Sequence, residues 1–466
     1  MSLPKYPHYK PSGVQWLGDV PAHWEITSLG RLAKERCDGP FGSGLTSDHY
    51  SEEGATVVRL QNIKAGSFHH GDPAYVALDY FLQELQRHSV VPGDLLVAGL
   101  GDDNNLLGRA CVAPENLGPA LVKADCFRFR IDSDLAYPRF VAFQLSAGAA
   151  FDAGMMSSGT TRSRIPLGVM STRKVANPSM DEQISIVEFL DHETAKIDAL
   201  IAEQEKLIRL LAEKRQATLS HAVTRGLDPA APMKDSGVAW LGEVPAHWEV
   251  VRVKALSQFT TSGPRGWSER ITDGGSLFIQ SGDLNDALGL EYESAKRVNV
   301  GDDAEAARTR LAEGDVVVCI TGAKTGNVAL CSLLHEPAYV NQHLCLIRPS
   351  DGVHGRFLAL SLKSTVGQTQ FEISQYGLKQ GLSLESVREL WVACPPREEQ
   401  ESIVVLLDEE TTRLDALRAE AERAIALLKE RRAALIAAAV TGQIDVRQNS
   451  EILNGGEARD AVAALS

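Results

Sequence analysis

The chain has 466 residues, of which 44% are hydrophobic, and 47 Lys and Arg residues against 61 Asp and Glu residues give a formal net charge of −14. This composition excludes disordered, collagen-like and disulfide-scaffold chains, and it argues mildly against a globally basic nucleic-acid-binding protein. No apolar run of about 18 residues predicts a transmembrane helix, and the seven cysteines form no C-x-x-C pair. We therefore expect a cytoplasmic protein with free thiols, no membrane partner and no zinc site.

Two sequence blocks occur twice, in the same order. Residues 12–25 read SGVQWLGDVPAHWE and residues 236–249 read SGVAWLGEVPAHWE, so that twelve of fourteen positions agree. Residues 181–200 and 398–417 agree at twelve of twenty positions. The period exceeds about 200 residues, which is far longer than a solenoid repeat or a propeller blade. The chain is therefore interpreted as a tandem duplication of two domain-sized copies.

The middle of each copy is expected to be a mixed α/β domain. Short β-type runs alternate with stretches rich in Gly, Pro, Asn and Asp. Between the repeated blocks the copies agree only at scattered positions, such as Gly93-Asp94 with Gly314-Asp315. The expected strands are residues 57–60, 94–98, 127–131, 277–280, 316–320 and 344–347, and short helices are expected at residues 138–145 and 355–362.

A long helix is predicted after each middle. Residues 181–224 contain neither Pro nor Gly, and Gly226 stands where a C-cap glycine belongs. The second helix is predicted to begin at Pro396, which suits a first helical turn, and to end before Gly442. Each helix would span about 45 residues, or roughly 65 Å. A helix of this length with one apolar stripe needs a partner along most of that stripe.

Apolar residues at alternating spacings of three and four predict a coiled-coil seam along both helices. We expect the two helices to pair antiparallel about a pseudo-two-fold axis, and pairing between two molecules is the alternative. The predicted seam and partner-docking residues are Leu190, Ile197, Ile201, Ile208, Leu211, Leu407, Leu414, Ile425 and Leu428.

The resulting fold class is α/β, with two mixed α/β domains joined by two long antiparallel coiled-coil helices in an internal pseudo-two-fold duplication. The predicted boundaries are residues 1–177 for the first domain, 178–226 for the first helix, 227–395 for the second domain, 396–446 for the second helix and 447–466 for a flexible tail.

Catalytic signatures are missing from the sequence. Residues 322–326 read GAKTG and lack the G-x-x-x-x-G-K-[ST] spacing of a phosphate loop. No H-E-x-x-H motif occurs, and no G-x-S-x-G or G-x-G-x-x-G motif convincingly follows an expected strand. We therefore expect a chain that is not an enzyme. An enzyme in its own right, such as a nuclease fused to a recognition domain, is the alternative.

Two similar domains on rigid helices suit an elongated ligand such as duplex DNA, because each domain would meet a separate half-site. The acidic total does not oppose this interpretation, since residues 1–177 carry 17 basic and 18 acidic side chains and are nearly neutral. Residues 159–175 hold four basic side chains and no acidic one. Their Arg, Ser and Thr donors suit phosphates and base edges. A solvated turn before the helix is the structural alternative.

Glycine-rich loops add to the candidate DNA contacts. Residues 40–47 read PFGSGLTS, and residues 260–267 read TTSGPRGW at the same place in the second copy. Such loops can approach a duplex closely, although an ordinary surface loop reads the same way. The candidate DNA-binding residues are Phe41, Gly42, Ser43, Thr46, Asn62, Thr160, Thr161, Arg162, Arg164, Arg265, Gln280, Lys324, Gln375, Tyr376, Lys379 and Gln380.

The chain resembles the specificity subunit of type I restriction–modification systems from about residue 11 to residue 446. The resemblance rests on both copies of SGVxWLGxVPAHWE and on DGPFGSGLTSDHY at residues 38–50. It rests also on Gly-Asp at the two matching positions and on a Pro…Glu-Gln…Ile pattern before each long helix, which in each copy ends in Ala-Val-Thr.

The resemblance implies a non-catalytic subunit. Each middle would be a target-recognition domain that reads one half of a bipartite, asymmetric DNA site. The helices would set the spacer and dock two adenine methyltransferase subunits, and a restriction and translocase subunit would join for cleavage. S-adenosylmethionine, ATP and Mg²⁺ would be bound by these partners and no cofactor by this chain. The second copy departs from the PFGSGL pattern. The alternative is a coiled-coil scaffold that never reads DNA.

Overall fold

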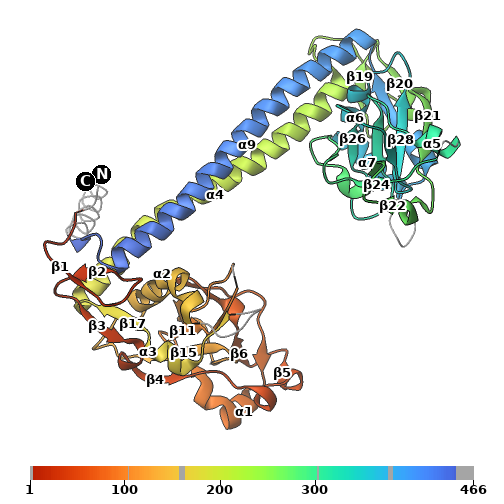
Figure 1. Cartoon of the computed structure of the whole chain (residues 1–466). Helices are drawn as coiled ribbons and strands as arrows, with labels where there is room; N and C mark the ends of the chain where they lie inside the picture. Colours follow the sequence, from red (N-terminus) through yellow and green to blue (C-terminus); the bar gives the residue numbers. More distant parts are fainter. Residues whose placement is uncertain (1–3, 103, 157–162, 302–303, 376–380, 448–466) are drawn as a thin grey trace. The chain divides into compact units, whose positions relative to one another are not determined.

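The computed structural model describes residues 4–102, 104–156, 163–301, 304–375 and 381–447 (Figure 1). The chain forms two units. Unit 1 consists of residues 1–203 with 424–466, and unit 2 consists of residues 204–423. Each unit combines sheets and short helices with one half of each of two long helices, so the predicted α/β fold class is confirmed.

The first sheet of unit 1 has four antiparallel strands in the order β13-β11-β15-β4. The apolar runs of β11 and β15 are almost entirely buried, because one face meets α2 and α3 and the other meets a second sheet. The bounds are β4 Ala33–Cys37, β11 Leu95–Ala98, β13 Ala110–Val112, β15 Cys126–Ile131, α2 Pro138–Met156 and α3 Leu167–Thr172. The expected helix at residues 138–145 is thus longer than predicted.

The second sheet of unit 1 has the order β10-β14-β6-β9-β5, with β6 and β14 parallel and the other pairs antiparallel. Unit 1 also contains smaller strand pairs, namely β1 with β2, β3 with β17, β7 with β8 and β12 with β16. The bounds are β1 Tyr9–Pro11, β2 Asp19–Pro21, β3 Glu25–Ser28, β5 Tyr50–Ser51, β6 Ala55–Val58, β7 Ile63–Lys64, β8 Ser67–Phe68, β9 Tyr75–Val76, α1 Leu78–Tyr80, β10 Ser89–Val90, β12 Leu100–Gly101, β14 Ala120–Val122, β16 Ser163–Arg164 and β17 Lys174–Asn177.

Unit 2 repeats this plan. Its first sheet has the order β21-β28-β25-β26, and its second sheet has the order β22-β24-β23-β27, with β23 and β27 parallel. The bounds are β18 Met233–Asp235, β19 Glu243–Pro245, β20 Glu249–Arg252, β21 Ser257–Ser262, β22 Ile271–Thr272, β23 Ser276–Ile279, β24 Lys296–Val298, α5 Ala304–Thr309, β25 Val316–Cys319, β26 Val328–Leu330, β27 Ala338–Val340, β28 Leu344–Pro349, α6 Gly355–Lys363, α7 Thr365–Ser374, α8 Leu384–Arg388 and β29 Trp391–Cys394.

The repeated Gly-Asp pair has a structural role in both units. In unit 1 the buried Asp94 carboxylate accepts the Val91 N–H at 2.9 Å and two hydrogen bonds from Arg130 at 3.0 Å. In unit 2, Asp315 accepts the Ala312 N–H and pairs with Arg348 in the same way. An ionised, buried carboxylate needs such partners. The motif therefore fixes the turn into the central strand of each first sheet.

The long helices are α4, Met180–Arg225, and α9, Arg397–Val440. In unit 1 the start of α4 meets the end of α9, because Val187 and Val440 share one apolar cluster and Asp198 pairs with Arg432. In unit 2 the end of α4 meets the start of α9, where Val223 and Val404 share a cluster. The two helices therefore run antiparallel within each unit, as predicted.

The predicted seam residues are buried or half-buried in the helix pair. Ile197, Leu211 and Leu414 are 4–8% exposed, and Ile201, Ile208, Ile425 and Leu428 are half-buried. Leu190 and Leu407 are fully buried in the clusters that join the helices to the α/β parts. These residues thus form the predicted seam of the helix pair, and their predicted role in docking a partner stays a prediction.

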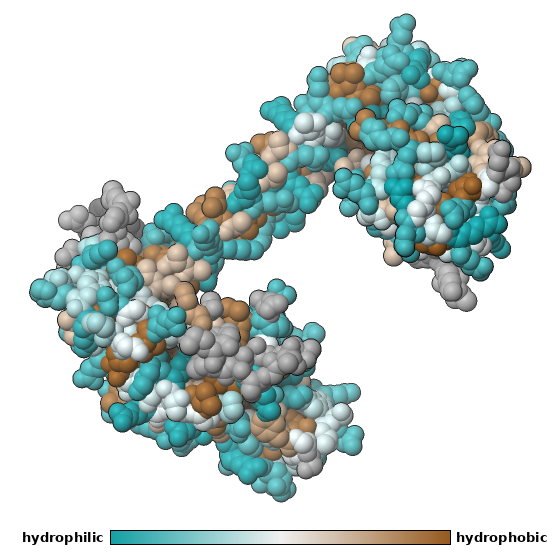
Figure 2. Space-filling model, in the orientation of Figure 1, coloured by the Kyte–Doolittle hydropathy of each residue, from teal (hydrophilic) through white to brown (hydrophobic). Residues whose placement is uncertain are grey.

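Other apolar side chains remain exposed on the two helices. Figure 2 shows a mainly hydrophilic surface along them that apolar patches interrupt. These side chains are more accessible to a docking partner than the predicted seam residues are. The exposed set is Ile184, Leu200, Leu207, Leu210, Val405, Leu406, Leu417 and Leu427.

The helix ends dock on the repeated SGVxWLGxVPAHWE blocks. Gly226 after α4 and Gly442 after α9 both have a φ of +73°, which confirms the predicted C-cap glycines. Gly226 lies against Trp248, and Gly442 lies against Trp24, and both of these Trp side chains are fully buried. The HW pairs of the repeat therefore pack the start of each α/β part against a helix end.

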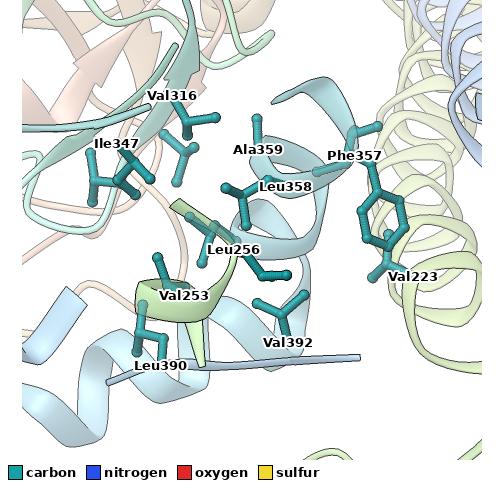
Figure 3. Close-up of a cluster of buried hydrophobic side chains, with 14 of the residues drawn as sticks. Val223, Val253, Leu256, Val316, Ile347, Phe357, Leu358, Ala359, Leu390 and Val392 are labelled. Carbon is teal, nitrogen blue, oxygen red and sulfur yellow. The ribbon is translucent and has the colours of Figure 1, made fainter. Parts of the chain in front are cut away.

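The core of unit 2 links the sheet to the helices. Phe357 of α6 is fully buried, and Figure 3 shows its ring pointing at Val223 of α4. Leu358 and Ala359, on the other side of α6, face Val316 and Ile347 of the sheet (Figure 3). The short helix therefore holds the sheet and the long helix together.

Candidate nucleic-acid interface

The Gly-Pro turn after β4 presents Phe41 to solvent. A Cβ on Gly39 would lie 2.0 Å from the Lys123 carbonyl carbon, so only glycine permits this approach. Gly42 has a φ of +59°, which also favours glycine. Phe41 between them is 47% exposed. The backbone of the turn is thus fixed against Lys123 while the aromatic ring stays accessible.

Arg164 lies beside this turn. Its strand β16 pairs with β12, and its Nε donates to Asp125 Oδ1 at 2.7 Å. Its guanidinium carbon is 5.2 Å from the centroid of the Phe41 ring, which is within cation–π distance. The side chain remains 50% exposed. Two of the predicted contacts, Phe41 and Arg164, are thereby brought together with an acid that the sequence interpretation did not name.

A polar pocket of about 560 Å³ opens next to β12. Gly101 of β12 lines this pocket and pairs with Ser163, the neighbour of Arg164. The pocket therefore adjoins the Arg164 strand. Its polar lining consists of Arg59, Gln61, Lys64, Asp102, Asn105, Arg109 and Lys123.

Arg109 forms the base of the pocket. It is 6% exposed, and its guanidinium donates to the carbonyls of Leu60, Ile63, Leu100, Asn105 and Leu106 at 2.7–3.3 Å. Burial lowers the pKa of the Arg109 guanidinium from its usual value. One buried cation thus holds three chain segments around the pocket.

The Asp102 carboxylate in the pocket accepts hydrogen bonds from its own loop. Asp102 Oδ1 accepts the N–H groups of Asn104 and Asn105 at 3.0 and 2.7 Å. The hydrogen bonds from Asn105 hold the pKa of the Asp102 carboxyl below its usual value. Lys64 Nζ donates to Asn105 Oδ1 at 3.1 Å, so this lysine is bonded to the same loop. Among the described lining residues there are four cations and one acid, a balance that suits a phosphate backbone.

Sequence reasoning missed Arg59, Gln61, Lys64 and Lys123. The available signal was position, because Arg59 and Lys123 directly follow the buried runs ATVV and ALV, and Gln61 and Lys64 stand a few residues after the first run. Side chains at such strand ends project from the sheet edge, where loops carry function.

Unit 2 presents different side chains on the same turn. A Cβ on Gly263 would lie 2.0 Å from the Val340 carbonyl oxygen, and Gly266 has a φ of +89°. Arg265 between them is exposed and forms no ion pair with any described residue. Its position corresponds to that of Phe41. The apparent departure of the second copy from the first is therefore a change of side chains on a shared Gly-Pro-x-Gly turn.

Lys324 and Gln280 lie near this turn but are partly committed to the fold. Lys324 Nζ donates to the carbonyls of Gly282 and Leu284 at 3.1 and 3.0 Å. The Gln280 N–H donates to Asp283 Oδ2 at 2.7 Å. Burial raises the pKa of Asp283, while Lys296 and Lys324 act in the opposite direction. Lys324 is thus a loop-holding residue as well as an exposed cation.

Asn62 is the counterpart of Asp283 and lies in the interior. It is 5% exposed, its Oδ1 accepts the Arg59 N–H at 2.7 Å, and its Nδ2 donates to the carbonyls of His69 and His70. All of its bonding is thus directed to the backbone. This corrects its assignment as a DNA contact, because a base edge would have to displace these bonds.

The remaining candidates stand in loops or turns or lie outside the described residues. Thr46 is exposed and bonds with His49 Nδ1 through its N–H and its hydroxyl. Ser43 stands in the turn Gly42–Gly44, and Gln375 directly follows α7. Thr160, Thr161, Arg162, Tyr376, Lys379 and Gln380 lie outside the described residues.

In the described ranges of the chain, no group of three or more His, Cys, Asp and Glu side chains is arranged to hold a metal ion. Likewise, the helices described here include none with the length and apolar character to cross a bilayer. All seven cysteines are free, and burial raises the pKa of Cys345 to about 12.

The known proteins that this chain resembles are specificity subunits of type I restriction enzymes. The model of the type I restriction modification DNA specificity domain matches residues 245–424. The EcoBI specificity subunit of Escherichia coli is 22% identical over 89% of this chain and 85% of its own length. The EcoKI specificity subunit of E. coli strain K12 is 21% identical over 96% and 95%. The StySPI specificity subunit of Salmonella potsdam is 20% identical over the same shares.

Solved structures share the fold. A chain from a study of complex assembly and conformational transition of the type I R-M system has a TM-score of 0.62 at 18% identity, over 90% of this chain and 98% of that chain. The HsdS subunit from Thermoanaerobacter tengcongensis has a TM-score of 0.50 at 19% identity, over 91% and 98%. With the family match and the curated relatives, these findings confirm the predicted resemblance: the chain is similar, over most of its length, to the specificity subunits of type I restriction–modification systems.

Proposed function

We propose that this chain is the DNA-specificity subunit of a type I restriction–modification system. Each unit would read one half of a bipartite duplex site, and the chain would bring its partner subunits to that site. The observation that carries this proposal is the surface of unit 1, where Phe41 and Arg164 adjoin a pocket lined by four cations. Exposed donors beside a positive pocket suit base edges next to a phosphate backbone.

The two half-sites would differ in sequence. The units share a backbone plan but present unlike side chains, with Phe41 and Lys64 in unit 1 where unit 2 has Arg265 and Asn285. Base readout depends on the donors and acceptors of individual side chains. Unlike side chains on one frame would therefore read unlike bases, and the full site would be asymmetric.

The chemistry would be supplied by partners. Two methyltransferase subunits would dock along α4 and α9, where exposed apolar side chains such as Leu210 and Leu427 offer contact area. S-adenosylmethionine would be bound by these subunits, and ATP and Mg²⁺ by a restriction and translocase subunit. The present chain would contribute recognition and spacing, and we assign no catalytic step to it.

Methylation mapping tests the proposal. The chain is co-expressed with its methyltransferase subunit, and methylated adenines are mapped across the host genome. We expect them to fall in one motif made of two short specific halves separated by a fixed gap. Methylated adenines without a common motif, or the absence of methylation, would refute the proposal.

The alternative function is a coiled-coil scaffold without DNA readout, which the acidic total charge of −14 favours. A gel shift at several salt concentrations separates the two, because phosphate contacts weaken steeply with salt. The triple variant R59A/K64A/K123A should flatten the salt dependence, since each lost phosphate contact reduces the log–log slope by about one. If the chain is only a scaffold, neither the unmodified chain nor the triple variant should give a salt-dependent shift.

A further inference from the structure

The two units correspond residue by residue around the candidate interface. In unit 1 the Gly99 N–H donates to the Asp125 carbonyl, and the Ile165 N–H donates to the Gly99 carbonyl. In unit 2 Ile320 makes the same two bonds, with the carbonyl of His343 and the N–H of Leu382. Ile165 therefore corresponds to Leu382. One residue earlier, Arg164 corresponds to Gly381, which pairs with Thr321 as Arg164 pairs with Leu100.

The two units carry an arginine of the candidate interface on different segments. On the Gly-Pro turn, unit 1 has Phe41 and unit 2 has Arg265. On the segment beside the turn, unit 1 has Arg164 and unit 2 has Gly381. Each unit thus presents one arginine from this pair of neighbouring positions, and the two units take it from opposite members of the pair.

The arginine of unit 1 is held in a defined orientation. Asp125 accepts a hydrogen bond from Nε only, and the Phe41 ring lies against the guanidinium face. The two terminal nitrogens make no hydrogen bond with a described residue, and the side chain is half exposed. Asp125 itself has a φ of +63°, an uncommon value for a residue other than glycine. In this conformation the Asp125 carboxylate lies within hydrogen-bond distance of Arg164 Nε.

We infer that Arg164 and Arg265 are equivalent specificity-determining residues, each of which reads a guanine in the half-site of its own unit, with Asp125 as the positioning residue for Arg164. This inference rests on the proposed function. A guanidinium held at Nε presents its two terminal N–H groups as a fork. Guanine offers O6 and N7 as a matching pair of acceptors in the major groove, and this is the commonest specific contact of arginine.

The experiment measures base preference at each position. The full chain, purified with its co-expressed partner subunits, selects duplexes from a library randomised over both half-sites. R164A should lose the preference for guanine at one position of one half-site by about 10- to 100-fold. R265A should do the same at one position of the other half-site. R164K should lose the preference while it keeps most of the affinity, because lysine keeps the charge without the fork.

An exchange variant tests the equivalence directly. R164G removes the arginine of unit 1, and F41R/R164G gives unit 1 the pair of residues found in unit 2. We expect the guanine preference to be lost in the first variant and to return in the second. If F41R/R164G selects as indiscriminately as R164G, the equivalence of the two arginines is overturned.

The matched control is R31A, which removes an exposed arginine of unit 1 that lies on the 3-10 turn Leu29–Arg31, on neither of the segments that carry the candidate residues. It should leave every position of the site unchanged. Equal, sequence-independent losses in R164A and R31A would overturn the inference, as would unchanged preferences in R164A and R265A. Failure of the proposed function is a different result, because the unmodified chain would then select no motif.

Discussion

At the scale of single residues, the two units stabilise the same turn with different cations. In unit 1 the buried Arg109 donates to the Ile63 carbonyl and to four others. In unit 2 Lys324 donates to the equivalent carbonyl of Leu284, and Asn327 supports it there. A lysine in a basic or polar loop is therefore a contact candidate only after its bonds inside the fold have been counted.

The neighbours Asn62 and Gln61 provide a matched test of structural against surface roles. N62A should destabilise unit 1 by about 2 kcal/mol, because it removes the side-chain partner of the Arg59 N–H and two backbone carbonyls. Q61A should change the stability by less than about 0.5 kcal/mol, because Gln61 is exposed. Urea unfolding measures both variants. An equal effect of the two would contradict the structural role of Asn62.

At the scale of secondary-structure elements, the two repeated blocks act as docking platforms for helix ends. The end of α9 is tied to the first block by the bond from Gln443 Nε2 to the Asp19 carbonyl, and to the segment just before the block by the bond from Tyr9 Oη to the Gly442 carbonyl. The α4 start is tied through Glu182, which accepts from Tyr6 Oη at 2.7 Å and bonds His23. His247 and Glu399 repeat this last pair in unit 2. The repeated residues thus dock the ends of the long helices.

The two capping glycines should differ in their sensitivity to alanine. Both have a φ of +73°, so either substitution costs about 1–2 kcal/mol of backbone strain. A Cβ on Gly442 would also lie 2.3 Å from Pro21 Cδ, whereas the nearest atoms to a Cβ on Gly226 are at 3.2 Å. G442A should therefore destabilise unit 1 by about twice as much as G226A destabilises unit 2, or more.

Hydrogen exchange resolved by mass spectrometry measures this difference within the full chain. Peptides that cover β3 and β17 report on unit 1, and peptides that cover β20 and β29 report on unit 2. We expect G442A to raise exchange in the first pair more than G226A does in the second. The reverse order would contradict this prediction. It would mean that Pro21 can move away from the added Cβ and that backbone strain at the cap alone sets the loss of stability.

At the scale of the whole molecule, unit 1 is built from both ends of the chain. The N–H of Asp445 donates to the Pro4 carbonyl at 2.8 Å, and Gln144 Nε2 donates to the Val440 carbonyl. Both long helices then continue from unit 1 into unit 2. Their length is therefore the natural measure of a spacer between two half-sites, in accordance with the proposed function.

A paired deletion tests this spacer role. Removing residues 201–207 from α4 and residues 423–429 from α9 keeps the phase of the apolar stripes and follows the register of the Asp198–Arg432 pair. Seven residues correspond to about 10.5 Å of helix, so the gap between the half-sites should shorten by about 3 base pairs. Methylation mapping in the presence of the partner subunits measures the gap.

The matching control duplicates the same two segments and should lengthen the gap by about 3 base pairs. Neither change should alter the bases within the half-sites. Altered half-sites with an unchanged gap would show that the division of labour between helices and α/β parts is wrong.

The sequence by itself determined the features that depend on residue type and local spacing. The duplication, the two long helices, the capping glycines and the buried strands follow from repeated letters, periodicity and apolar runs, and the structure confirms them. Phe41 and Arg164 could be named as contact candidates because an aromatic ring and an arginine in glycine- or serine-rich loops are visible in one dimension. Their role in DNA binding stays a prediction.

Only the tertiary structure decided which side chains share a surface. The correspondence of Arg265 with Phe41, the burial of Asn62, the positive pocket around Arg109 and the Asp125 anchor all depend on which segments meet. Arg164 and Asp125 are 39 positions apart in the sequence, and Arg109 and Leu60 are 49 positions apart. Such partners are selected by packing and backbone approach, for which a single sequence carries no local signal.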